Sequence, residues 1–228
     1  MDQQDKPEYV RELFSAIASR YVLVNHLLSG GLDVLWRAAA VRHVSRWQPS
    51  LLLDVATGSG DLALSIRKGS PGTRIVGADF CRPMLEVAKH RGLNELVEAD
   101  GLHLPFADAS FNAVTAAFGL RNMASWDRGL SEMSRILKPG GHLLILDFSL
   151  PSLPLIRPLY RAYLHYILPS IAGLATGRKD AYEYLGGSIE QFPSGSAMTG
   201  LIERCGFREA KAYPLSLGTV SLYTAEKI

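Results

Sequence analysis

The sequence predicts an α/β fold in which seven strands form a mostly parallel sheet, with helices on both faces and an antiparallel C-terminal hairpin. Two observations support this prediction. Short apolar runs of strand length alternate along the chain with segments whose apolar residues recur at helical spacing. In addition, 228 residues with a 47% hydrophobic composition can bury one full core, so we expect a single domain over residues 1–228.

The first half of the chain supplies most of this alternation. Helical spacing over 8–28, followed by a helix over 35–47, predicts an N-terminal helical lid within residues 1–47. We expect buried strands at 51–54, 74–79, 96–99, 111–118 and 142–148. Between them, helices are expected from Asp61 onward and at 83–91 and 126–137. Repeated strand–helix–strand units favour a parallel sheet.

A second group of helices is predicted after the fifth strand. Residues 151–175 are rich in Leu, Ile and Tyr, but they contain basic residues and prolines: Arg157, Arg161, His165, Pro158 and Pro169. A transmembrane helix needs about 20 mainly apolar residues. We therefore expect a helical insertion over 151–200 that covers an apolar pocket. Residues 206–213 and 219–225 then predict two strands that complete the sheet as a hairpin.

Composition excludes several classes of protein. The formal net charge of +2 comes from 24 basic and 22 acidic residues, so the chain lacks the basic excess of a nucleic-acid-binding protein. The two cysteines, Cys81 and Cys205, stand far apart, so we predict neither a disulfide framework nor a metal site. The polar N-terminus has no apolar run of the kind found in secretory signals, and we expect a cytoplasmic protein.

A glycine-rich turn after the first predicted strand is the strongest functional motif. The residues Gly58-Ser59-Gly60-Asp61-Leu62-Ala63 match the G-x-G-x-x-G/A pattern of nucleotide-binding turns. Alone, such a match is also compatible with a tight turn that has no ligand. An acidic residue stands at or directly after the end of three successive predicted strands: Asp54, Asp79 and Asp100. We expect these three carboxylates to face one crevice.

The charges around this turn favour S-adenosylmethionine over a nicotinamide dinucleotide. A dinucleotide needs its pyrophosphate at the helix N-terminus, where Asp54 and Asp61 would repel it. A cationic sulfonium with an α-amino group suits these carboxylates better. In that arrangement the turn and Asp54 face the amino-acid end, Asp79 binds the ribose hydroxyls, and Asp100 accepts from the adenine amino group.

Further motifs are distributed along the chain. They are residues 14–21, residues 25–33 with Trp36-Arg37, the turn around Gly58, Phe118-Gly119-Leu120-Arg121-Asn122, and residues 182–193. Together they resemble the menaquinone/ubiquinone biosynthesis C-methyltransferases, a branch of the class I methyltransferases, over nearly the whole chain. The resemblance implies a Rossmann-like fold, with S-adenosylmethionine as methyl donor and S-adenosylhomocysteine as product.

The resemblance also implies a set of cofactor contacts. Tyr21 is expected to cover the amino-acid end of the cofactor, and the other positions are Ser59, Asp79, Asp100, Gly101 and Ala117. With the turn and its neighbours, the predicted set further includes Asp54, Thr57, Gly58, Gly60 and Phe80. The chain departs from the family pattern at Val22, where Asp is usual, at Thr57 and Ser59, where Gly and Thr are common, and at Asp100-Gly101, where Asn-Ala is frequent.

For the reaction, the resemblance implies methyl transfer to a ring carbon of a polyprenylated quinol, either a demethylmenaquinol or a methoxy-benzoquinol. Ionising a phenolic hydroxyl, whose reference pKa is about 10, makes the adjacent carbon nucleophilic. We expect the always-charged Arg121 to stabilise the phenolate and Asn122 to orient the ring oxygen. The alternative for Arg121 is a structural role in which it holds a helix end or a carboxylate.

The general base and the substrate wall have several candidates. His165, Tyr184 and His26 are chemically able to accept a proton, although a single His is more often structural. Tyr184, Ser188 and Phe192 are expected to line the substrate pocket, with a packing turn as the alternative for Phe192. The apolar region 153–174 is the expected wall for the prenyl chain, with an ordinary helical core as the alternative.

The expected partners follow from the substrate. We expect no nucleic acid, a polyprenylated quinol, and peripheral contact with the inner face of the membrane from which so apolar a substrate must be drawn. A homodimer is a further expectation. Other small-molecule methyltransferases, an NAD-dependent dehydrogenase and a non-catalytic cofactor-binding protein remain alternatives. For the dehydrogenase, the Tyr and Lys four residues apart that a short-chain enzyme needs are matched by Tyr223 and Lys227, in strand-like sequence at the C-terminus.

Overall fold

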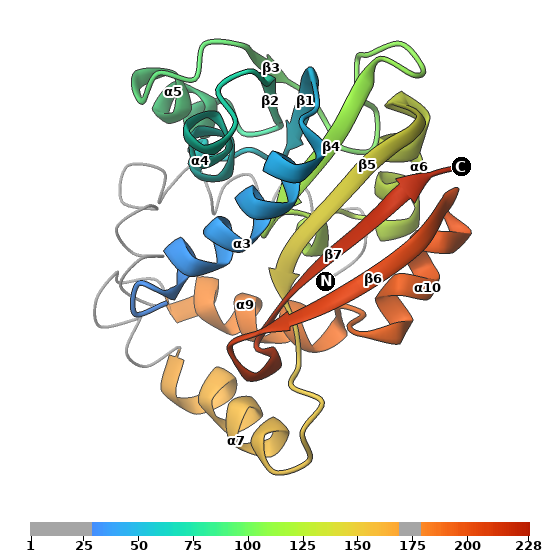
Figure 1. Cartoon of the computed structure of the whole chain (residues 1–228). Helices are drawn as coiled ribbons and strands as arrows, with labels where there is room; N and C mark the ends of the chain where they lie inside the picture. Colours follow the sequence, from blue (N-terminus) through green and yellow to red (C-terminus); the bar gives the residue numbers. More distant parts are fainter. Residues whose placement is uncertain (1–28, 169–178) are drawn as a thin grey trace.

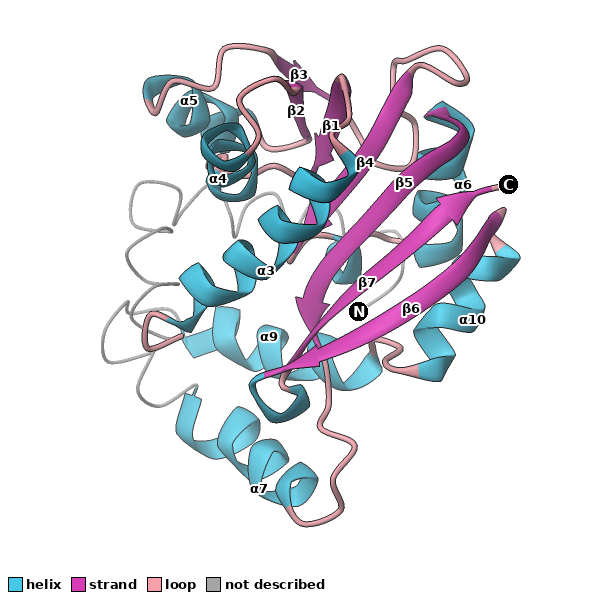
Figure 2. Cartoon of the chain, viewed as in Figure 1, coloured by secondary structure: helices cyan, strands magenta, loops and turns pink. Residues whose placement is uncertain are grey.

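The computed structural model describes residues 29–168 and 179–228. Its centre is a seven-stranded sheet with the order β3-β2-β1-β4-β5-β7-β6, flanked by helices (Figures 1 and 2). The strands are β1 (Leu51–Val55), β2 (Arg74–Asp79), β3 (Leu96–Glu98), β4 (Phe111–Ala117), β5 (Leu137–Phe148), β6 (Phe207–Leu215) and β7 (Val220–Lys227). The predicted fold class is confirmed.

The first five strands run parallel, and the sheet order reverses between β1 and β4. β1 pairs with β2 on one side and with β4 on the other, both in parallel register. In a sheet of this kind, helices cross over in opposite directions on the two sides of that point, which leaves a crevice beyond the carboxyl ends of the strands. The sheet topology therefore places a ligand site after β1 and β4.

The C-terminal strands form the predicted antiparallel hairpin. β7 lies between β5 and β6 and runs antiparallel to both of them. β6 is therefore the edge strand, and most of its residues are exposed. Charged residues and a register shift between Arg208 and Lys211 mark this edge, as is usual for edge strands that do not pair with another chain.

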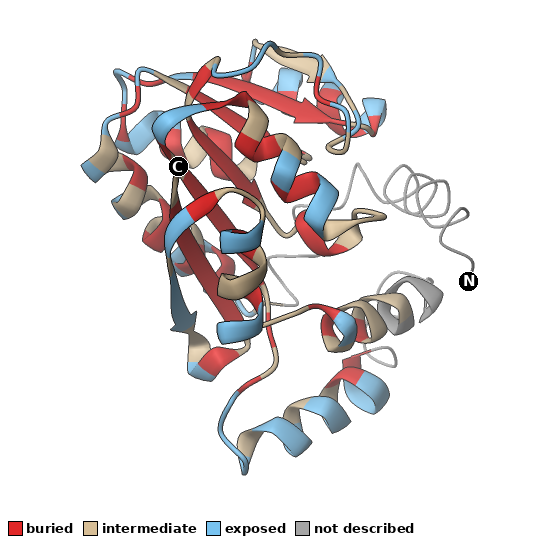
Figure 3. Cartoon of the chain, turned by 90° about the vertical axis from the view of Figure 1, so that its right-hand side faces the viewer, coloured by how far each residue is buried: buried red, intermediate tan, exposed pale blue. Residues whose placement is uncertain are grey.

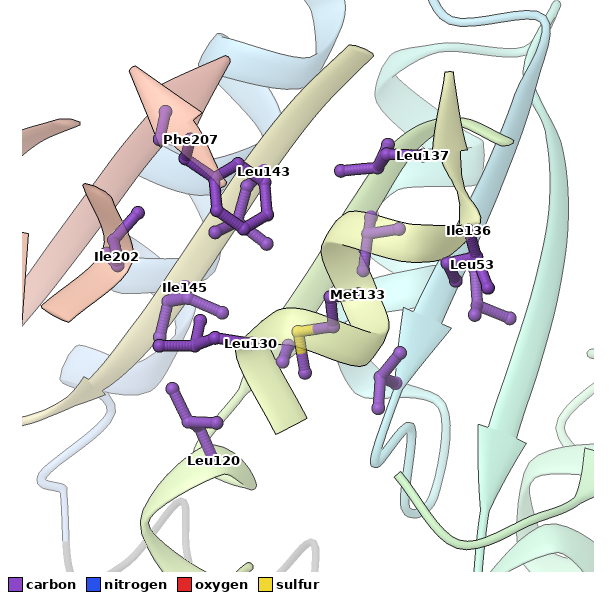
Figure 4. Close-up of a cluster of buried hydrophobic side chains, with 14 of the residues drawn as sticks. Leu53, Leu120, Leu130, Met133, Ile136, Leu137, Leu143, Ile145, Ile202 and Phe207 are labelled. Atoms are coloured by element: carbon purple, nitrogen blue, oxygen red, sulfur yellow. The ribbon is translucent and has the colours of Figure 1, made fainter. Parts of the chain in front are cut away.

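Two apolar cores lie on the two faces of the sheet. Alternate residues of one strand enter different cores, because successive side chains of a strand point to opposite faces. On β1, Leu52 packs against α3 (Leu32–Trp47) and α4 (Asp61–Gly69), whereas Leu53 belongs to the core that contains α6 (Trp126–Ile136) and α10 (Ser196–Arg204). Figure 4 shows this second core around Met133, and Figure 3 shows that burial is concentrated in the sheet. α5 (Arg82–His90) follows β2.

β5 begins earlier than predicted. The residues Lys138-Pro139-Gly140-Gly141, expected as a turn, lie within the span of β5 (Leu137–Phe148). Leu137 pairs with Phe111 and His142 pairs with Ala113, so a longer stretch of β5 faces a shorter one of β4. Residues 138–140 are exposed at this irregularity. The sequence signal for a break was correct locally, but strand pairing continues on both sides of it.

After β5 the chain leaves the sheet and forms the predicted helical segment. It contains α7 (Ile156–Ala162), a π-helical turn η2 (Tyr163–Ile167) and α9 (Lys179–Gln191). α7 lies beyond the carboxyl end of β5, and α9 lies between it and the sheet (Figure 1). Among the residues that the structure describes, none of the helices is long and apolar enough to cross a bilayer. The expected helices over 8–28, with Tyr21, Val22 and His26, lie outside the described residues.

Candidate functional site

A cleft opens beyond the carboxyl ends of β1, β2, β3 and β4, where the sheet order reverses. Its lining combines backbone from the strand ends with few polar side chains: Val55, Ala56, Asp79, Phe80, Ala99, Asp100, Gly101, Leu102, Gly119, Asn122, Met123 and Ala124. Five of the residues predicted from the sequence, namely Asp79, Phe80, Asp100, Gly101 and Asn122, are in this lining. The topology thus brings together side chains from four separate strand ends.

The backbone is constrained where β1 and β4 end. Ala56 and Phe118, each the first residue after its strand, have φ of 52° and 57°, a region that non-glycine residues rarely adopt. Gly119 lies so close to this turn that a Cβ atom there would meet the Ala56 Cβ at 2.3 Å. Strained backbone of this kind concentrates at ligand sites, and here it forms the cleft between the two strands.

The glycine-rich turn is held against the end of β2 by its backbone. Thr57 N donates to Ala78 O at 3.0 Å, and Gly58 N donates to the Asp79 carboxylate at 2.7 Å. Gly58 and Gly60 have φ of +55° and +79°, which explains why glycine occupies both positions. The turn therefore has the conformation that its sequence predicted.

Ser59, the central residue of this turn, is buried and faces α4 and Arg91. Its hydroxyl donates to Asp61 Oδ2 at 2.7 Å. Arg91 donates to the Ser59 carbonyl at 2.7 Å and to Asp61 Oδ1 at 2.9 Å. These contacts stabilise the turn and partly neutralise Asp61 at the start of α4.

Asp79 is the best-placed polar group for a ribose diol. Its Oδ2 accepts from Gly58 N at 2.7 Å and its Oδ1 accepts from Cys81 N at 2.9 Å. The residue is 6% exposed, and burial raises its pKa to about 6 despite these donors. Each carboxylate oxygen has two lone pairs, so the carboxylate that lines the cleft retains acceptor capacity for hydroxyl groups.

Asp54 lies beneath the turn rather than in the cleft lining. Its two carboxylate oxygens accept from Thr57 Oγ1 at 2.7 Å and from Thr115 Oγ1 at 2.6 Å. Burial raises its pKa to about 6, although both hydroxyl donors act in the opposite direction. Asp54 and Thr57 therefore link β1, the turn and β4, and in this way they shape the site.

The remaining predicted cofactor positions occupy different surroundings. Asp100 is exposed and its Oδ1 accepts from Leu102 N at 2.9 Å. Gly101 lies under Met123, whose Cε would be 2.6 Å from an added Cβ. Ala117 ends β4 and packs with the core on the α3 face of the sheet. Asp100 and Gly101 thus form one wall of the cleft.

Arg121 pairs with a buried carboxylate that the sequence reasoning did not identify. Its Nη1 is 2.7 Å from Asp147 Oδ1 at the end of β5, and its backbone N donates to Asp147 Oδ2 at 3.3 Å. Nη1 also donates to Phe118 O at 2.7 Å. Arg121 is 5% exposed and Asp147 is fully buried. The structure therefore shows Arg121 holding a carboxylate, and this contact also fixes the turn after β4.

Asn122 and Tyr184 come together from segments far apart in the sequence. The Tyr184 hydroxyl donates to Asn122 Oδ1 at 3.4 Å, and Asn122 Nδ2 donates to Phe118 O at 3.3 Å. Asn122 lines the cleft, whereas Tyr184 of α9 is outside the lining and contacts Asn122 from behind it. Ser188, one turn further along α9, donates to the carbonyl of Leu185 at 2.8 Å. Tyr184 therefore connects the helical segment to the cleft.

Two predicted residues lie in surroundings that suit their structural alternatives. The His165 side chain is 49% exposed and pairs with Glu190 at 3.1 Å, beside Arg161. Phe192 is 4% exposed and packs edge-on against Trp126, with ring centroids 5.4 Å apart. Neither is in the cleft lining. The structure does not bring them to the side chains around Asp79.

Several residues of this site are not among those predicted from the sequence. Ala56, Gly119 and Met123 line the cleft, and Asp147 anchors Arg121. A signal existed for Gly119, which stands inside the motif 118–122, and for Asp147, an acidic residue near the end of an apolar strand. The pairing of Asp147 with Arg121 depends on the neighbouring positions of β4 and β5 and has no local signature.

Comparison with known proteins adds independent evidence. The chain matches the ubiE/COQ5 methyltransferase family over residues 2–227. It is 41% identical to a demethylmenaquinone methyltransferase of Deinococcus radiodurans, over 99% of this chain and 95% of the relative. It is 42% identical to the protein of the same name from Thermus thermophilus, over 94% and 100% of the two chains. Identity to the ubiquinone/menaquinone biosynthesis C-methyltransferase UbiE of Geobacter sp. strain M21 is 40%, over 98% of both.

Solved structures share the fold at lower identity. A SAM-dependent methyltransferase from Thermotoga maritima superposes with a TM-score of 0.69 at 19% identity, over 95% of this chain and 99% of that one. Human N-acetylserotonin methyltransferase, solved with SAM, gives a TM-score of 0.59 at 19% identity, over 87% and 54%. These similarities confirm the Rossmann-like fold. Because the family match extends over almost the entire sequence, the chain belongs to the ubiE/COQ5 methyltransferase family.

Proposed function

We propose that this protein transfers a methyl group from S-adenosylmethionine to a ring carbon of a polyprenylated quinol, with demethylmenaquinol as the preferred acceptor. The single observation that carries the proposal is the cleft at the sheet reversal, which both Asp79 and Asn122 line in a chain of this family. Two of the relatives described above are named demethylmenaquinone methyltransferases, which supports the choice of acceptor.

The cleft residues fit S-adenosylmethionine. Asp79 is suited to the ribose hydroxyls, because its carboxylate lines the cleft and is already oriented by two backbone donors. Asp100 is suited to the adenine amino group, on the wall of the cleft that it forms with Gly101. The bound cofactor would supply an electrophilic methyl group on a sulfonium. Unlike a nicotinamide dinucleotide, S-adenosylmethionine has no pyrophosphate that the carboxylates around the turn would repel.

The chain's own residues would then prepare the acceptor ring. The ring carbon would form its bond to methyl as the sulfur–methyl bond breaks, S-adenosylhomocysteine would leave, and the ring proton would pass to water. Catalysis of such a displacement depends on positioning and on stabilising the phenolate that makes the carbon nucleophilic. Asn122 would orient a ring oxygen from within the cleft, and Tyr184 would hold the Asn122 amide in place.

Arg121 would contribute positive charge next to this position. Burial raises the pKa of the Tyr160 phenol, while the Arg121 charge acts on it in the opposite direction. The Arg121 guanidinium is therefore near enough to Tyr160 for its charge to favour the ionised phenol, although burial has the larger effect on that pKa. It also lies over the Phe148 ring, 5.2 Å from its centroid. A substrate phenolate near Arg121 would be stabilised in the same way.

A methoxy-benzoquinol is the second candidate acceptor. The relative from Geobacter carries a name that covers both ubiquinone and menaquinone biosynthesis. Such an acceptor is also an ionisable phenol with a free ring carbon, so the same cleft residues would serve it. The choice between the two acceptors is therefore part of the test.

The test is a methyl-transfer assay with purified protein, isotopically labelled S-adenosylmethionine and short-tailed forms of both quinols under reducing conditions. We expect label on a ring carbon, with a higher kcat/KM for demethylmenaquinol. Asn122→Ala should lower kcat at least tenfold while the circular dichroism spectrum stays unchanged, because it removes an orienting group from the cleft. Label on oxygen, or no transfer to either quinol, would contradict the proposal.

A further inference from the structure

Large apolar side chains are exposed together at one end of the molecule. Leu155 is 81% exposed, Leu159 67% and Tyr166 76%, all in or beside α7 and η2. Leu217, between β6 and β7, is 70% exposed. The backbone joins these two regions, since a Cβ on Gly218 would be 3.3 Å from the Cα of Pro151. We call Leu153, Leu155, Leu159, Tyr166, Ile167 and Leu217 the apolar face.

This face is held outward by contacts on the opposite side of the segment. Leu164 is 2% exposed and Ile189 of α9 is 1% exposed, and both belong to one small core between η2 and α9. Glu190 of α9 accepts from Arg161 at 2.9 Å and from His165 at 3.1 Å. The segment therefore cannot rotate to bury its exposed side chains without breaking this core. Several large apolar side chains exposed on one short segment mark an interaction site.

The charge of the segment indicates what covers the face. Between Asp147 and Asp180 the sequence contains no acidic residue, but it contains Arg157, Arg161, Arg178 and Lys179. Arg157 is exposed on α7 itself, and Arg161, also exposed there, pairs with Glu190 of α9. Apolar side chains flanked by basic ones suit the interface of a bilayer with anionic headgroups, where each basic residue near the surface adds to the attraction.

The apolar face is also connected to the cleft. α9, against which η2 packs, carries Tyr184, whose hydroxyl donates to Asn122 in the cleft lining. The same segment begins directly after β5, whose Asp147 holds Arg121. Figure 1 shows α7 and the turn between β6 and β7 at the same end of the molecule, with α9 leading toward the sheet. A substrate that leaves a bilayer at this face would reach the cleft along α9.

We propose that the apolar face docks on an anionic lipid bilayer and orients the cleft toward it, so that a membrane-resident acceptor enters without crossing water. This inference rests on the proposed function for its account of the acceptor, but the binding itself is independent of catalysis. The apolar side chains insert at the headgroup boundary, and Arg157 lies at the level of the lipid phosphates.

Vesicle binding tests the docking directly. Purified full-length protein is sedimented with phosphatidylcholine vesicles, with and without about 30% phosphatidylglycerol, an anionic lipid that gives the surface the negative potential that attracts basic segments. We expect binding to the mixed vesicles and at least tenfold weaker binding to the neutral ones. Leu155→Ser combined with Leu159→Ser, and separately Arg157→Glu, should each reduce binding to mixed vesicles at least fivefold. Ile228→Ser is the matched control, because Ile228 is 65% exposed outside the apolar face.

Kinetics separate this inference from the proposed function. With a water-soluble quinol that has no prenyl tail, the Leu155→Ser/Leu159→Ser variant should keep the wild-type kcat/KM, because both side chains are exposed and lie outside the cleft lining. With a long-tailed quinol in mixed vesicles, its rate should fall at least fivefold. If the wild-type protein methylates none of the quinols but still binds the vesicles, only the proposed function is rejected. Equal vesicle binding by wild type and variant, or a dimer that becomes a monomer in the variant, would overturn the docking.

Discussion

Removing one member of the Arg121–Asp147 pair should destabilise the fold far more than removing both. Arg121→Met leaves the fully buried Asp147 carboxylate without its guanidinium, and Asp147→Asn leaves a buried guanidinium without its carboxylate. Breaking a buried ion pair by removing one partner costs about 3–5 kcal/mol, because the other charge remains desolvated. We expect each single variant to lose about that much free energy of unfolding.

The double variant should recover much of this loss. Neither charge is then buried, and the single amide oxygen that Asp147→Asn leaves can still accept from the backbone N–H of Phe148, which Asp147 Oδ1 now accepts at 2.9 Å. The backbone N–H of residue 121, which Asp147 Oδ2 now accepts at 3.3 Å, loses its acceptor. The remaining cost includes the hydrogen bond from Arg121 to Phe118 O and the one from the backbone N–H of residue 121, each about 1 kcal/mol, and the contact of the guanidinium with the Phe148 ring. Against summed single losses of about 6–10 kcal/mol, the expected coupling is several kcal/mol.

Urea unfolding at pH 7, followed by circular dichroism, measures all four proteins of this cycle. Losses that simply add, or single losses below about 1 kcal/mol, would show that the pair does not behave as a buried ion pair. Methyl-transfer assays on the same proteins address chemistry. If the Arg121 charge stabilises the substrate phenolate, the double variant regains stability but stays slow. Activity that returns together with stability would assign Arg121 a positioning role alone.

Three further predictions concern the cleft. Burial raises the pKa of Asp79 to about 6, and only the ionised carboxylate accepts hydrogen bonds from two hydroxyl groups. The affinity for S-adenosylmethionine, measured by calorimetry, should therefore fall as the pH drops below 6. An equally steep fall in the Asp79→Asn variant would contradict this prediction. Gly119→Ala would place a Cβ 2.3 Å from that of Ala56 and should cost about 1–3 kcal/mol in urea unfolding, whereas Gly72→Ala, with nothing within 4 Å, should cost far less. Tyr184→Phe removes one long hydrogen bond and should lower kcat severalfold while the melting temperature changes little; an unchanged kcat would exclude the hydroxyl from the reaction.

Elements with a local signature were predictable in detail. β2 was expected at 74–79 and occupies Arg74–Asp79, because a short apolar run bounded by turns defines it. The turn at Gly58 was equally predictable, since the required backbone conformation favours glycine. Asp79 was expected in the cleft because an acidic residue at the carboxyl end of the next strand necessarily faces the same edge of a parallel sheet.

Residues whose role depends on distant partners were predicted less well. His165 was chosen for its chemistry, but its surroundings depend on Glu190, which α9 brings to it. Phe192 was expected in the substrate pocket, but it packs against Trp126 of α6 in the apolar core. In both cases the chemistry of the side chain is visible in the sequence, but the neighbour that decides its environment comes from another part of the chain.

By itself the sequence determined the strands, the glycine turn, the carboxylates at the strand ends and the resemblance to a methyltransferase family. These properties follow from hydrophobic periodicity and backbone sterics, which act over a few residues. Only the tertiary structure decided that Asp54 supports the turn while Asp79 lines the cleft, and that Arg121 pairs with Asp147. Burial and charge pairing depend on which segments the sheet brings together, and that is a property of the assembled fold.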